Sequence, residues 1–335
     1  MSNFNSDTID VKNLSMVYKY SAINENASNR FAKLFAKIKK EKKALDSINF
    51  SISKGNIVGY VGLNGAGKTT TIKILSGIMK PSSGEVTVLG YNPFEKKEDF
   101  LKKISIIMGS KSQLIWDLPA IDSIEFNKKI YEVDEKRYKK YLDMMVDILN
   151  VSEILNKQVR CLSLGERMKI ELIAALIHQP KVIFLDEPTI GLDIISQENI
   201  RTFLKNINSE WNSTIILTSH NIDDISEVCN GLLLIDQGKL CYSGELSKFI
   251  QEYGGKVVKL TVVDKQDEII HEILNKHMKI AEVIRNQIVL EINDSLSLNN
   301  IKNLWGDFSN EITDVSIENK ELKDLITCEI NSLII

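Results

Sequence analysis

Short runs of apolar residues recur along the first two thirds of the chain and are separated by stretches with helical spacing. The clearest runs are Ile57–Val61, Val182–Leu185, Thr214–Thr218 and Leu232–Ile235. Continuous apolar runs of this length are typical of strands that are buried on both faces, and the helical stretches between them predict parallel crossovers. We therefore expect an α/β fold whose functional loops follow the carboxyl ends of parallel strands.

The pattern becomes mainly helical between about residues 98 and 178. Within Tyr138–Leu149, for example, Tyr141, Met145 and Leu149 fall on one helical face. This block predicts a helical subdomain inserted into the α/β core.

The pattern changes again after residue 245. Segments follow one another in the order strand, helix, strand, strand, helix, strand, and a last helix lies near Glu321. The segments are Lys256–Val263, Glu268–His277, Ile280–Ile292 as one or two strands, Asn299–Phe308 and Ile312–Ile317. We expect a first domain over 1–245 and a small α+β accessory domain over 246–335.

A basic insertion interrupts the first domain within about residues 21–43. Arg30–Lys43 carries seven basic residues and one glutamate. Its large apolar residues recur at helical spacing: Phe31, Leu34, Phe35 and Ile38. This combination predicts a basic amphipathic helix. Such a helix lies at a membrane surface or on a partner, or it packs its apolar stripe on its own domain, and the sequence leaves these alternatives open.

Composition and charge narrow the classes of function. No stretch approaches the roughly 18 consecutive apolar residues that a membrane-spanning helix needs, and the first residues lack the features of a secretory signal. The formal net charge is −3, without the basic excess that is common in nucleic-acid-binding proteins. We expect a cytoplasmic protein that does not bind nucleic acid.

A phosphate-binding loop is predicted at Gly62–Thr69, which matches G-x-x-x-x-G-K-[ST] between an apolar strand and the helical stretch Thr70–Leu75. Glycines let the backbone wrap a phosphate, and the helix N-terminus adds positive potential. We expect Lys68 to bridge the terminal phosphates and the Thr69 hydroxyl to ligate Mg²⁺. The candidate nucleotide-binding residues of this loop are Gly62, Leu63, Asn64, Gly65, Ala66, Gly67, Lys68, Thr69 and Thr70.

Two carboxylates, Asp186 and Glu187, follow the run Val182–Leu185. In P-loop nucleotidases an acid at this place holds Mg²⁺ through water, a role that we assign to Asp186. Glu187 is placed to polarise the attacking water as a general base. The alternative for two adjacent acids is a solvated turn, and the P-loop upstream disfavours it.

Leu162–Arg167 lies between these two halves of the predicted site. Ser163 and Glu166 have the spacing of a capping box that opens the following helix. A serine-capped helix N-terminus with Gly165 beside it is also an anion site. The two interpretations are compatible.

The order of these motifs resembles that of ATP-binding-cassette (ABC) ATPases, over about residues 8–245. The likeness rests on the P-loop from Gly62, Leu-Ser-Leu-Gly-Glu from Leu162, Leu-Asp-Glu-Pro-Thr from Leu185, Gly191–Asp193 and Thr218–His220. It implies a P-loop NTPase domain with a parallel-sheet core, an antiparallel N-terminal sheet and a helical subdomain. It also implies hydrolysis of ATP with Mg²⁺.

The resemblance implies that the active unit is a dimer. Ser163, Gly165 and Glu166 would contact the γ-phosphate of the ATP held by a second ATPase subunit, either another copy or a related chain. Asp193 would line the dimer interface. Leu164 stands where the family usually has glycine, and Glu166 where it often has glutamine. A monomer would then hydrolyse ATP poorly.

The resemblance assigns two more contacts and raises one question. His220 would contact the γ-phosphate of the ATP on its own chain, and Tyr18 would stack on the adenine. Counting back from Leu118 places Ser110 where the family has a glutamine that senses Mg²⁺ and the transporter, and Gln113 follows three residues later. Either Gln113 ligates Mg²⁺ through a shifted loop, or water completes the metal shell.

A narrower resemblance is to the ABC-2-type export ATPases, a group that includes viologen and drug exporters. Besides the basic insertion, it rests on Leu114–Pro119, Arg160–Met168 and Pro188–Asp193. It implies the ATPase subunit of an exporter at the inner face of the cell membrane, driving separate permease subunits. They would dock on Ser110–Tyr131, with Trp116 and Leu118 as apolar anchors. The alternatives are an importer ATPase and a soluble cassette ATPase that acts on nucleic acid or ribosomes.

Overall fold

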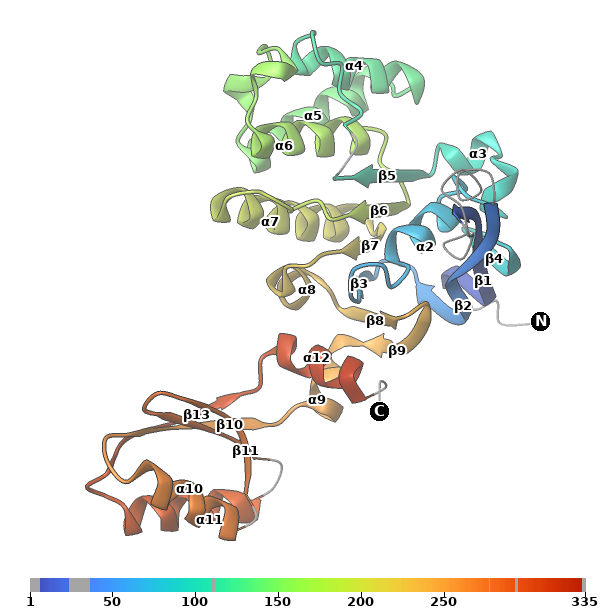
Figure 1. The fold of residues 1–335 in the computed structure, drawn as a ribbon. Helices are drawn as coiled ribbons and strands as arrows, with labels where there is room; N and C mark the ends of the chain where they lie inside the picture. Colours follow the sequence, from blue (N-terminus) through green and yellow to red (C-terminus); the bar gives the residue numbers. More distant parts are fainter. Residues whose placement is uncertain (1–6, 24–36, 110–111, 277, 293–294, 333–335) are drawn as a thin grey trace, which may run out of the picture. The chain divides into compact units, whose positions relative to one another are not determined.

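The computed structural model describes residues 7–23, 37–109, 112–276, 278–292 and 295–332. The chain divides into two compact units, Met1–Leu246 and Ser247–Ile335, which we describe one at a time (Figure 1). Among the described residues, none of the helices combines the length and apolar character that a bilayer-spanning segment requires.

A six-stranded sheet forms the centre of the first unit, in the order β5-β6-β7-β3-β8-β9. Neighbouring strands are parallel except for β8 and β9. Every residue of β3, β7 and β8 is buried, which fits parallel strands with both faces covered. The predicted α/β fold is confirmed. The strands are β3 (Ile57–Val61), β5 (Ile104–Met108), β6 (Val182–Asp186), β7 (Thr214–Thr218), β8 (Gly231–Asp236) and β9 (Lys239–Glu245).

The helical block predicted over 98–178 contains one strand, β5, which the sequence pattern does not separate from the helices around it. Its residues pair in parallel with β6 from Ile104↔Val182 to Met108↔Asp186. The rest of the block is mainly helical, and α4, α5 and α6 lie together beyond the β5 edge of the sheet (Figure 1). The helices are α3 (Glu98–Leu101), α4 (Ala120–Ile130), α5 (Glu135–Leu149) and α6 (Leu164–Leu176).

A three-stranded antiparallel sheet, β2-β1-β4, completes the first unit, as the resemblance implies. Its inward-facing residues, among them Ile9, Leu45 and Val88, pack in one core with Ile72 and Leu75 of the helix that follows the P-loop. The sheet thereby fixes the position of that helix. The elements are β1 (Asp7–Ile23), β2 (Lys37–Ser53), β4 (Ser83–Val88) and α2 (Lys68–Leu75).

The predicted basic amphipathic helix is wrong where the structure describes it. Residues 37–43 belong to strand β2, which pairs with β1 from Ile23↔Lys37 to Val17↔Lys43. Lysines three and four residues apart repel one another along a helix, whereas β1 offers a partner strand for every residue of the segment. Lys19 and Glu41, which are directly opposite, form an ion pair of 3.3 Å. Residues 24–36 lie outside the described residues.

Three further helices follow strands of the central sheet. Asp193 caps α7 through a hydrogen bond from Ser196 N, and Asn221 caps α8 through one from Asp223 N. These N-termini stand directly after the loops that leave β6 and β7. The helices are α7 (Ile194–Trp211), α8 (Ile222–Val228) and α9 (Leu246–Tyr253).

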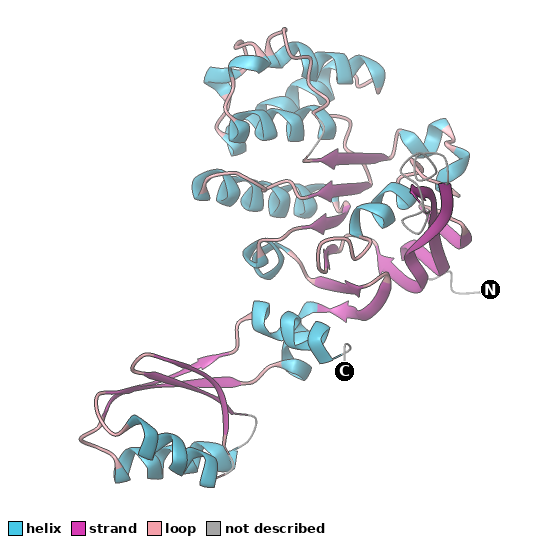
Figure 2. Cartoon of the chain, in the orientation of Figure 1, coloured by secondary structure: helices cyan, strands magenta, loops and turns pink. Residues whose placement is uncertain are grey.

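The second unit has a four-stranded antiparallel sheet in the order β11-β12-β10-β13. The chain runs β-α-β-β-α-β, so the topology is ferredoxin-like. Helices α10 and α11 cover one face (Figure 2), where Ile269, Ile273 and Leu304 pack on Val258 and Leu290. The elements are β10 (Lys256–Val262), α10 (Gln266–Asn275), β11 (Lys279–Ile284), β12 (Gln287–Ile292), α11 (Ser295–Asp307), β13 (Ile312–Asn319) and α12 (Leu322–Ser332).

Candidate nucleotide-binding site

The P-loop leaves β3 and enters α2 with Gly67 in a conformation that favours glycine, at φ 116°. A Cβ on Gly67 would lie 2.7 Å from the Ala44 carbonyl oxygen, so β2 presses directly on the loop. Lys68 Nζ donates hydrogen bonds to the carbonyl oxygens of Gly62, at 2.7 Å, and Leu63, at 3.2 Å. The lysine is thus folded back over the loop, where its amine can reach a bound phosphate.

Burial and charge act in opposite directions on Lys68. Its burial lowers the pKa, and the carboxylates of Glu187 and Asp186 raise it, with a net lowering. These two acids are therefore close enough to the amine to act on its charge. Lys68, Asp186 and Glu187 form one electrostatic site although more than 100 residues separate them in the chain.

A hydroxyl and a carboxylate meet at the end of β6. Thr69 Oγ1 donates a hydrogen bond to Asp186 Oδ2 at 2.9 Å, and Thr218 Oγ1 donates one to Asp186 Oδ1 at 2.7 Å. Mg²⁺ prefers oxygen ligands, often one or two protein oxygens together with water and substrate phosphates. The Thr69–Asp186 pair supplies that kind of donor set, so the residues present fit the ion.

Glu187 and His220 face each other beside this pair. His220 Nε2 lies 2.7 Å from Glu187 Oε1, and both side chains are partly exposed, at 42% and 24%. Glu187 has φ 57°, which is uncommon for a residue with a side chain. Its backbone N–H donates to Thr218 Oγ1 at 3.1 Å and so holds that conformation. Backbone strain of this kind is frequently stored at functional sites.

Lys68, Thr69 and Glu187 line a pocket of about 250 Å³, the nucleotide pocket. Tyr18 reaches it from β1, and its hydroxyl lies 3.2 Å from Thr70 Oγ1. Lys42 and Ala44 of β2 also line it. The sequence points to neither residue, because Lys42 falls in the predicted helix Arg30–Lys43 and Ala44 carries no recognisable signal. The pairing register of β1 and β2 would identify Lys42, because Lys42 is directly opposite Tyr18. The lining residues are Tyr18, Lys42, Ala44, Asn64, Gly65, Gly67, Lys68, Thr69, Thr70 and Glu187.

The other predicted P-loop residues, Gly62, Leu63 and Ala66, do not line the nucleotide pocket. Gly62 leaves no room for a side chain, because a Cβ would lie 2.1 Å from the Ile235 carbonyl oxygen. Ala66 is buried in the core under the N-terminal sheet, and Leu63 is 55% exposed. Gly62 and Ala66 therefore act as structural members of the loop.

The predicted capping box at the start of α6 is present. Glu166 N donates to Ser163 Oγ at 3.2 Å, and Ser163 N donates to the Glu166 carboxylate at 2.8 Å. The hydrogen bond from the Ser163 backbone holds the pKa of Glu166 below its ordinary value. A Cβ on Gly165 would lie 2.7 Å from Ser196 Oγ, so the N-termini of α6 and α7 meet at a glycine.

Asp193 completes this second cluster, which we call the signature side: Ser163, Gly165, Glu166 and Asp193. Hydrogen bonds from Ser196 lower the pKa of Asp193. None of these four residues lines the nucleotide pocket. The structure therefore separates the predicted nucleotide-binding residues into two groups, with the polar groups of the signature side bonded to their own helix N-termini.

Large apolar side chains surround the signature side and are exposed. Leu164 is 45% exposed, Ile190 55%, Ile194 81% and Ile195 75%. Leu164 also packs close to Gly191: a Cβ built on Gly191 would lie 3.2 Å from Leu164 Cδ2. Several large apolar side chains exposed in neighbouring stretches of the chain are typical of a protein–protein contact.

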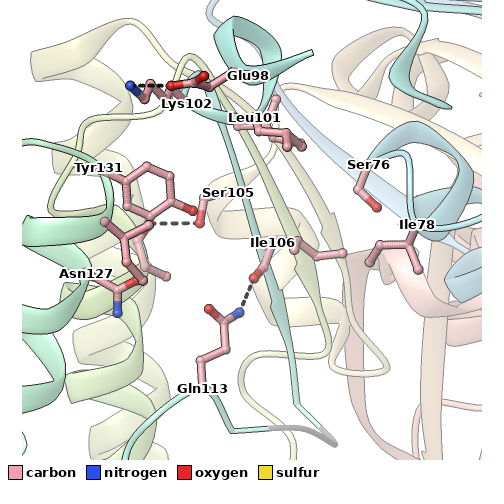
Figure 3. Close-up of a pocket in the computed structure, with 13 residues that line it drawn as sticks. Ser76, Ile78, Glu98, Leu101, Lys102, Ser105, Ile106, Gln113, Asn127 and Tyr131 are labelled. Atoms are coloured by element: carbon pink, nitrogen blue, oxygen red, sulfur yellow. Dashed lines mark hydrogen bonds and ion pairs between the residues drawn. The ribbon is translucent and has the colours of Figure 1, made fainter. Parts of the chain in front are cut away.

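Gln113, the candidate Mg²⁺ ligand, is hydrogen-bonded within its own region of the fold, and its role at the metal stays a prediction. Its side-chain amide donates to the Ile106 carbonyl oxygen at 2.7 Å (Figure 3), and its backbone N–H donates to Glu171 Oε1 at 3.0 Å. Glu171 is buried and ties the loop to α6. Ser110, the other candidate, lies outside the described residues.

The fold and the geometry of the nucleotide pocket together define a P-loop nucleotidase: a parallel sheet, a phosphate-binding loop before a helix, and an acidic pair at the end of a neighbouring strand. Comparison with known proteins gives the family. The family described as ABC transporter matches residues 45–190.

Curated relatives agree. The chain is 30% identical over 213 residues to the ABC transporter ATP-binding protein NatA of Bacillus subtilis, covering 64% of this chain and 86% of NatA. It is 34% identical over 198 residues to the bacitracin transport ATP-binding protein BcrA of Bacillus licheniformis, with 59% and 63% covered. It is 32% identical over 223 residues to the linearmycin resistance ATP-binding protein LnrL of Bacillus subtilis, with 66% and 71% covered.

Solved structures share the fold. The ATP-binding cassette MJ0796, solved as a dimer with ADP and Pi, matches with a TM-score of 0.58 and 22% identity over 71% of this chain and 98% of that one. The cbiO1 protein of Clostridium perfringens, part of the transporter complex cbiONQ, matches with a TM-score of 0.59 and 23% identity, over 80% and 95%. This chain belongs to the ABC transporter family and is an ATP-binding, ATP-hydrolysing subunit of that family.

Proposed function

We propose that this chain is the ATPase subunit of a membrane exporter and works at the inner face of the cell membrane, attached through permease subunits. The observation that carries the catalytic part is the pair of contacts at the end of β6: Thr69 to Asp186 at 2.9 Å and Glu187 to His220 at 2.7 Å. One contact provides oxygens for a metal ion, and the other provides a base with an oriented partner.

Each group has a distinct role in hydrolysis. Lys68 binds the terminal phosphates, and Thr69 and Asp186 would hold Mg²⁺. Glu187 takes a proton from the attacking water, and His220 fixes the Glu187 carboxylate and contacts the γ-phosphate. Mg²⁺, when bound, neutralises charge that develops on the phosphate oxygens.

Two residues of the N-terminal sheet hold the nucleoside end. Tyr18 stacks on the adenine, and Lys42 places a positive charge beside the ribose and the α-phosphate. The pairing of Tyr18 with Lys42 supports this, because directly opposite residues of antiparallel strands project from the same face. Among the described residues no ion pair is recorded for Lys42, so its ammonium is available to an anion.

The working unit is a dimer in which the signature side of one copy closes over the nucleotide pocket of the other. Two features support this. Ser163 and Gly165 do not line the pocket of their own chain, and Ile194 and Ile195 beside them are largely exposed. A two-fold arrangement of this type uses each surface twice and forms two equal sites.

The permease docks on the helical block beside β5. A pocket of about 440 Å³ opens there (Figure 3), lined by apolar Leu101 and Ile130 and by Gln113. Trp116 and Leu118, on the loop that leads to α4, are 48% and 41% exposed. The Arg167 guanidinium lies over the Trp116 ring at 5.0 Å and ties this loop to α6, whose N-terminus belongs to the signature side. Docking is thereby linked mechanically to ATP binding.

Export is favoured by the relatives described for bacitracin transport and linearmycin resistance. The test has two parts. We expect the tagged chain to co-purify with a multi-span protein from detergent-solubilised membranes, and a deletion strain to become more sensitive to membrane-active peptide antibiotics. A tagged chain that purifies alone or with ribosomes would overturn the permease-linked function. Co-purification with unchanged sensitivity over a broad panel would favour import.

A further inference from the structure

A buried acid lies behind the two catalytic loops. Asp224, on α8, is 1% exposed, and its carboxylate has three partners. Its Oδ2 accepts hydrogen bonds from the hydroxyl groups of Thr189 and Ser219, the second at 2.6 Å. Its Oδ1 accepts one from Arg201 Nε at 2.9 Å.

The two hydroxyl donors belong to the two loops that carry the catalytic pair. Thr189 follows Glu187 by two residues, and Ser219 precedes His220 by one. A single oxygen of Asp224 therefore joins the Glu187 loop to the His220 loop. The distance between the loops is set by this oxygen as well as by the strand pairing of β6 and β7.

Side chains of helix α7 hold Asp224 and both catalytic loops in place. Arg201 is 6% exposed and also binds Glu227 at 2.7 Å through Nη1. One turn earlier, Gln197 donates to the Leu192 carbonyl oxygen at 3.1 Å and accepts from Asn221 Nδ2 at 3.1 Å. The same helix face thus holds both loops, and the ion pair with Arg201 fixes the position of the Asp224 carboxylate.

We propose that Asp224 is a positioning residue for ATP hydrolysis, which holds Glu187 and His220 in contact by binding Thr189 and Ser219 together. The inference deepens the roles proposed for Glu187 and His220. Because Asp224 touches neither the nucleotide pocket nor the P-loop, its loss should lower the rate of hydrolysis and leave nucleotide affinity unchanged.

The experiment uses variants that spare the buried ion pair. Thr189→Val and Ser219→Ala each remove one hydroxyl from Asp224 Oδ2 and leave Asp224 with Arg201. Each is expected to lower kcat by at least tenfold, and the two together by about 100-fold, the size of a displacement of roughly 1 Å at a catalytic group. The Kd for ATP, measured with a fluorescent analogue, stays within twofold of wild type.

Glu227→Gln is the matched control, since it removes an ion pair from the same Arg201 without touching either loop. It should keep kcat within twofold of wild type. Asp224→Asn, which replaces an accepting oxygen by an N–H donor, should reproduce the double hydroxyl variant if it folds. Normal kcat in both hydroxyl variants, or an equal loss in Glu227→Gln, would overturn the proposal. Failure of Glu187 as the base is a separate result, seen as normal turnover in Glu187→Gln.

Discussion

The nucleotide pocket and the signature side differ in how their polar groups are used. At the nucleotide pocket, Lys68 bonds to the loop carbonyls and Thr69 bonds to the neighbouring Asp186, in positions that a phosphate and a metal ion would take over. On the signature side, Ser163 and Glu166 satisfy each other in a capping box, and the surface around them is apolar and exposed.

This difference indicates how the nucleotide pocket and the signature side each bind ATP. The nucleotide pocket is built to bind ATP within one chain, because its cation, its hydroxyl and its acids already converge. The signature side presents a helix N-terminus whose polar groups are bonded within the chain, beside large apolar side chains that are exposed. In the proposed dimer, the nucleotide that it contacts is the one bound by the other copy.

Glu187→Gln is expected to give the largest effect, because it removes the base and keeps the shape of the pocket. ATP turnover should fall by about 10²–10⁴-fold, while ATP binding persists and a closed dimer accumulates. Turnover is measured by phosphate release and the dimer by size exclusion with Mg·ATP. Glu210→Gln, an exposed glutamate on α7, is the control and should behave as wild type. Normal turnover in the Glu187 variant would exclude this residue as the base.

Ile194→Asp should break the dimer and spare the nucleotide pocket. In the proposed dimer the exposed Ile194 side chain is covered by the other copy, and burying an unpaired charge there is costly, so we expect dimerisation to weaken by about 100-fold. We expect Ile194→Asp in the Glu187→Gln background to elute as a monomer with Mg·ATP and still bind ATP. Ile317→Asp, at an exposed site of the second unit, should remain dimeric. A dimer in the Ile194 variant would place the interface elsewhere.

Lys42→Ala is expected to give the smallest effect on nucleotide affinity. It tests which part of the nucleotide the Lys42 ammonium contacts. One exposed charge contact is worth about 1 kcal/mol, so affinity should fall about fivefold. Because the α-phosphate is common to both nucleotides, ATP and ADP should weaken alike, and salt should reduce the difference from wild type. Lys40→Ala, two residues along the same strand and opposite Tyr20, is the control. If Lys42→Ala binds ATP and ADP as tightly as wild type, Lys42 does not contact the α-phosphate.

Local chemistry explains what the sequence predicts well. The P-loop, the acids after β6 and the capping box at Ser163 are each set by a few adjacent residues, so their spacing is enough to find them. The apolar runs of β3, β6, β7 and β8 are equally local. In each case the residues that form the feature are neighbours in the chain.

Non-local pairing explains what the sequence does not predict. The Lys37–Lys43 segment has apolar residues upstream at helical spacing, and its true partner, β1, lies on the other side of a long insertion. β5 is short, and an isolated apolar run does not distinguish strand from helix. Asp224 joins Thr189, Ser219 and Arg201 across the fold, and no spacing in the sequence connects them. The hydrogen bond from Gln113 to the buried Glu171 is likewise non-local, and no spacing in the sequence indicates it.

The central claim, that each active site combines the nucleotide pocket of one copy with the signature side of another, is tested most directly by mixing two inactive variants. Lys68→Ala breaks the nucleotide pocket, and Ser163→Arg breaks the signature side. In a mixed dimer, one site has both halves intact. With random pairing, half of the dimers are mixed, so the mixture should regain about a quarter of wild-type ATP turnover. A mixture that stays as inactive as each variant alone would contradict the account.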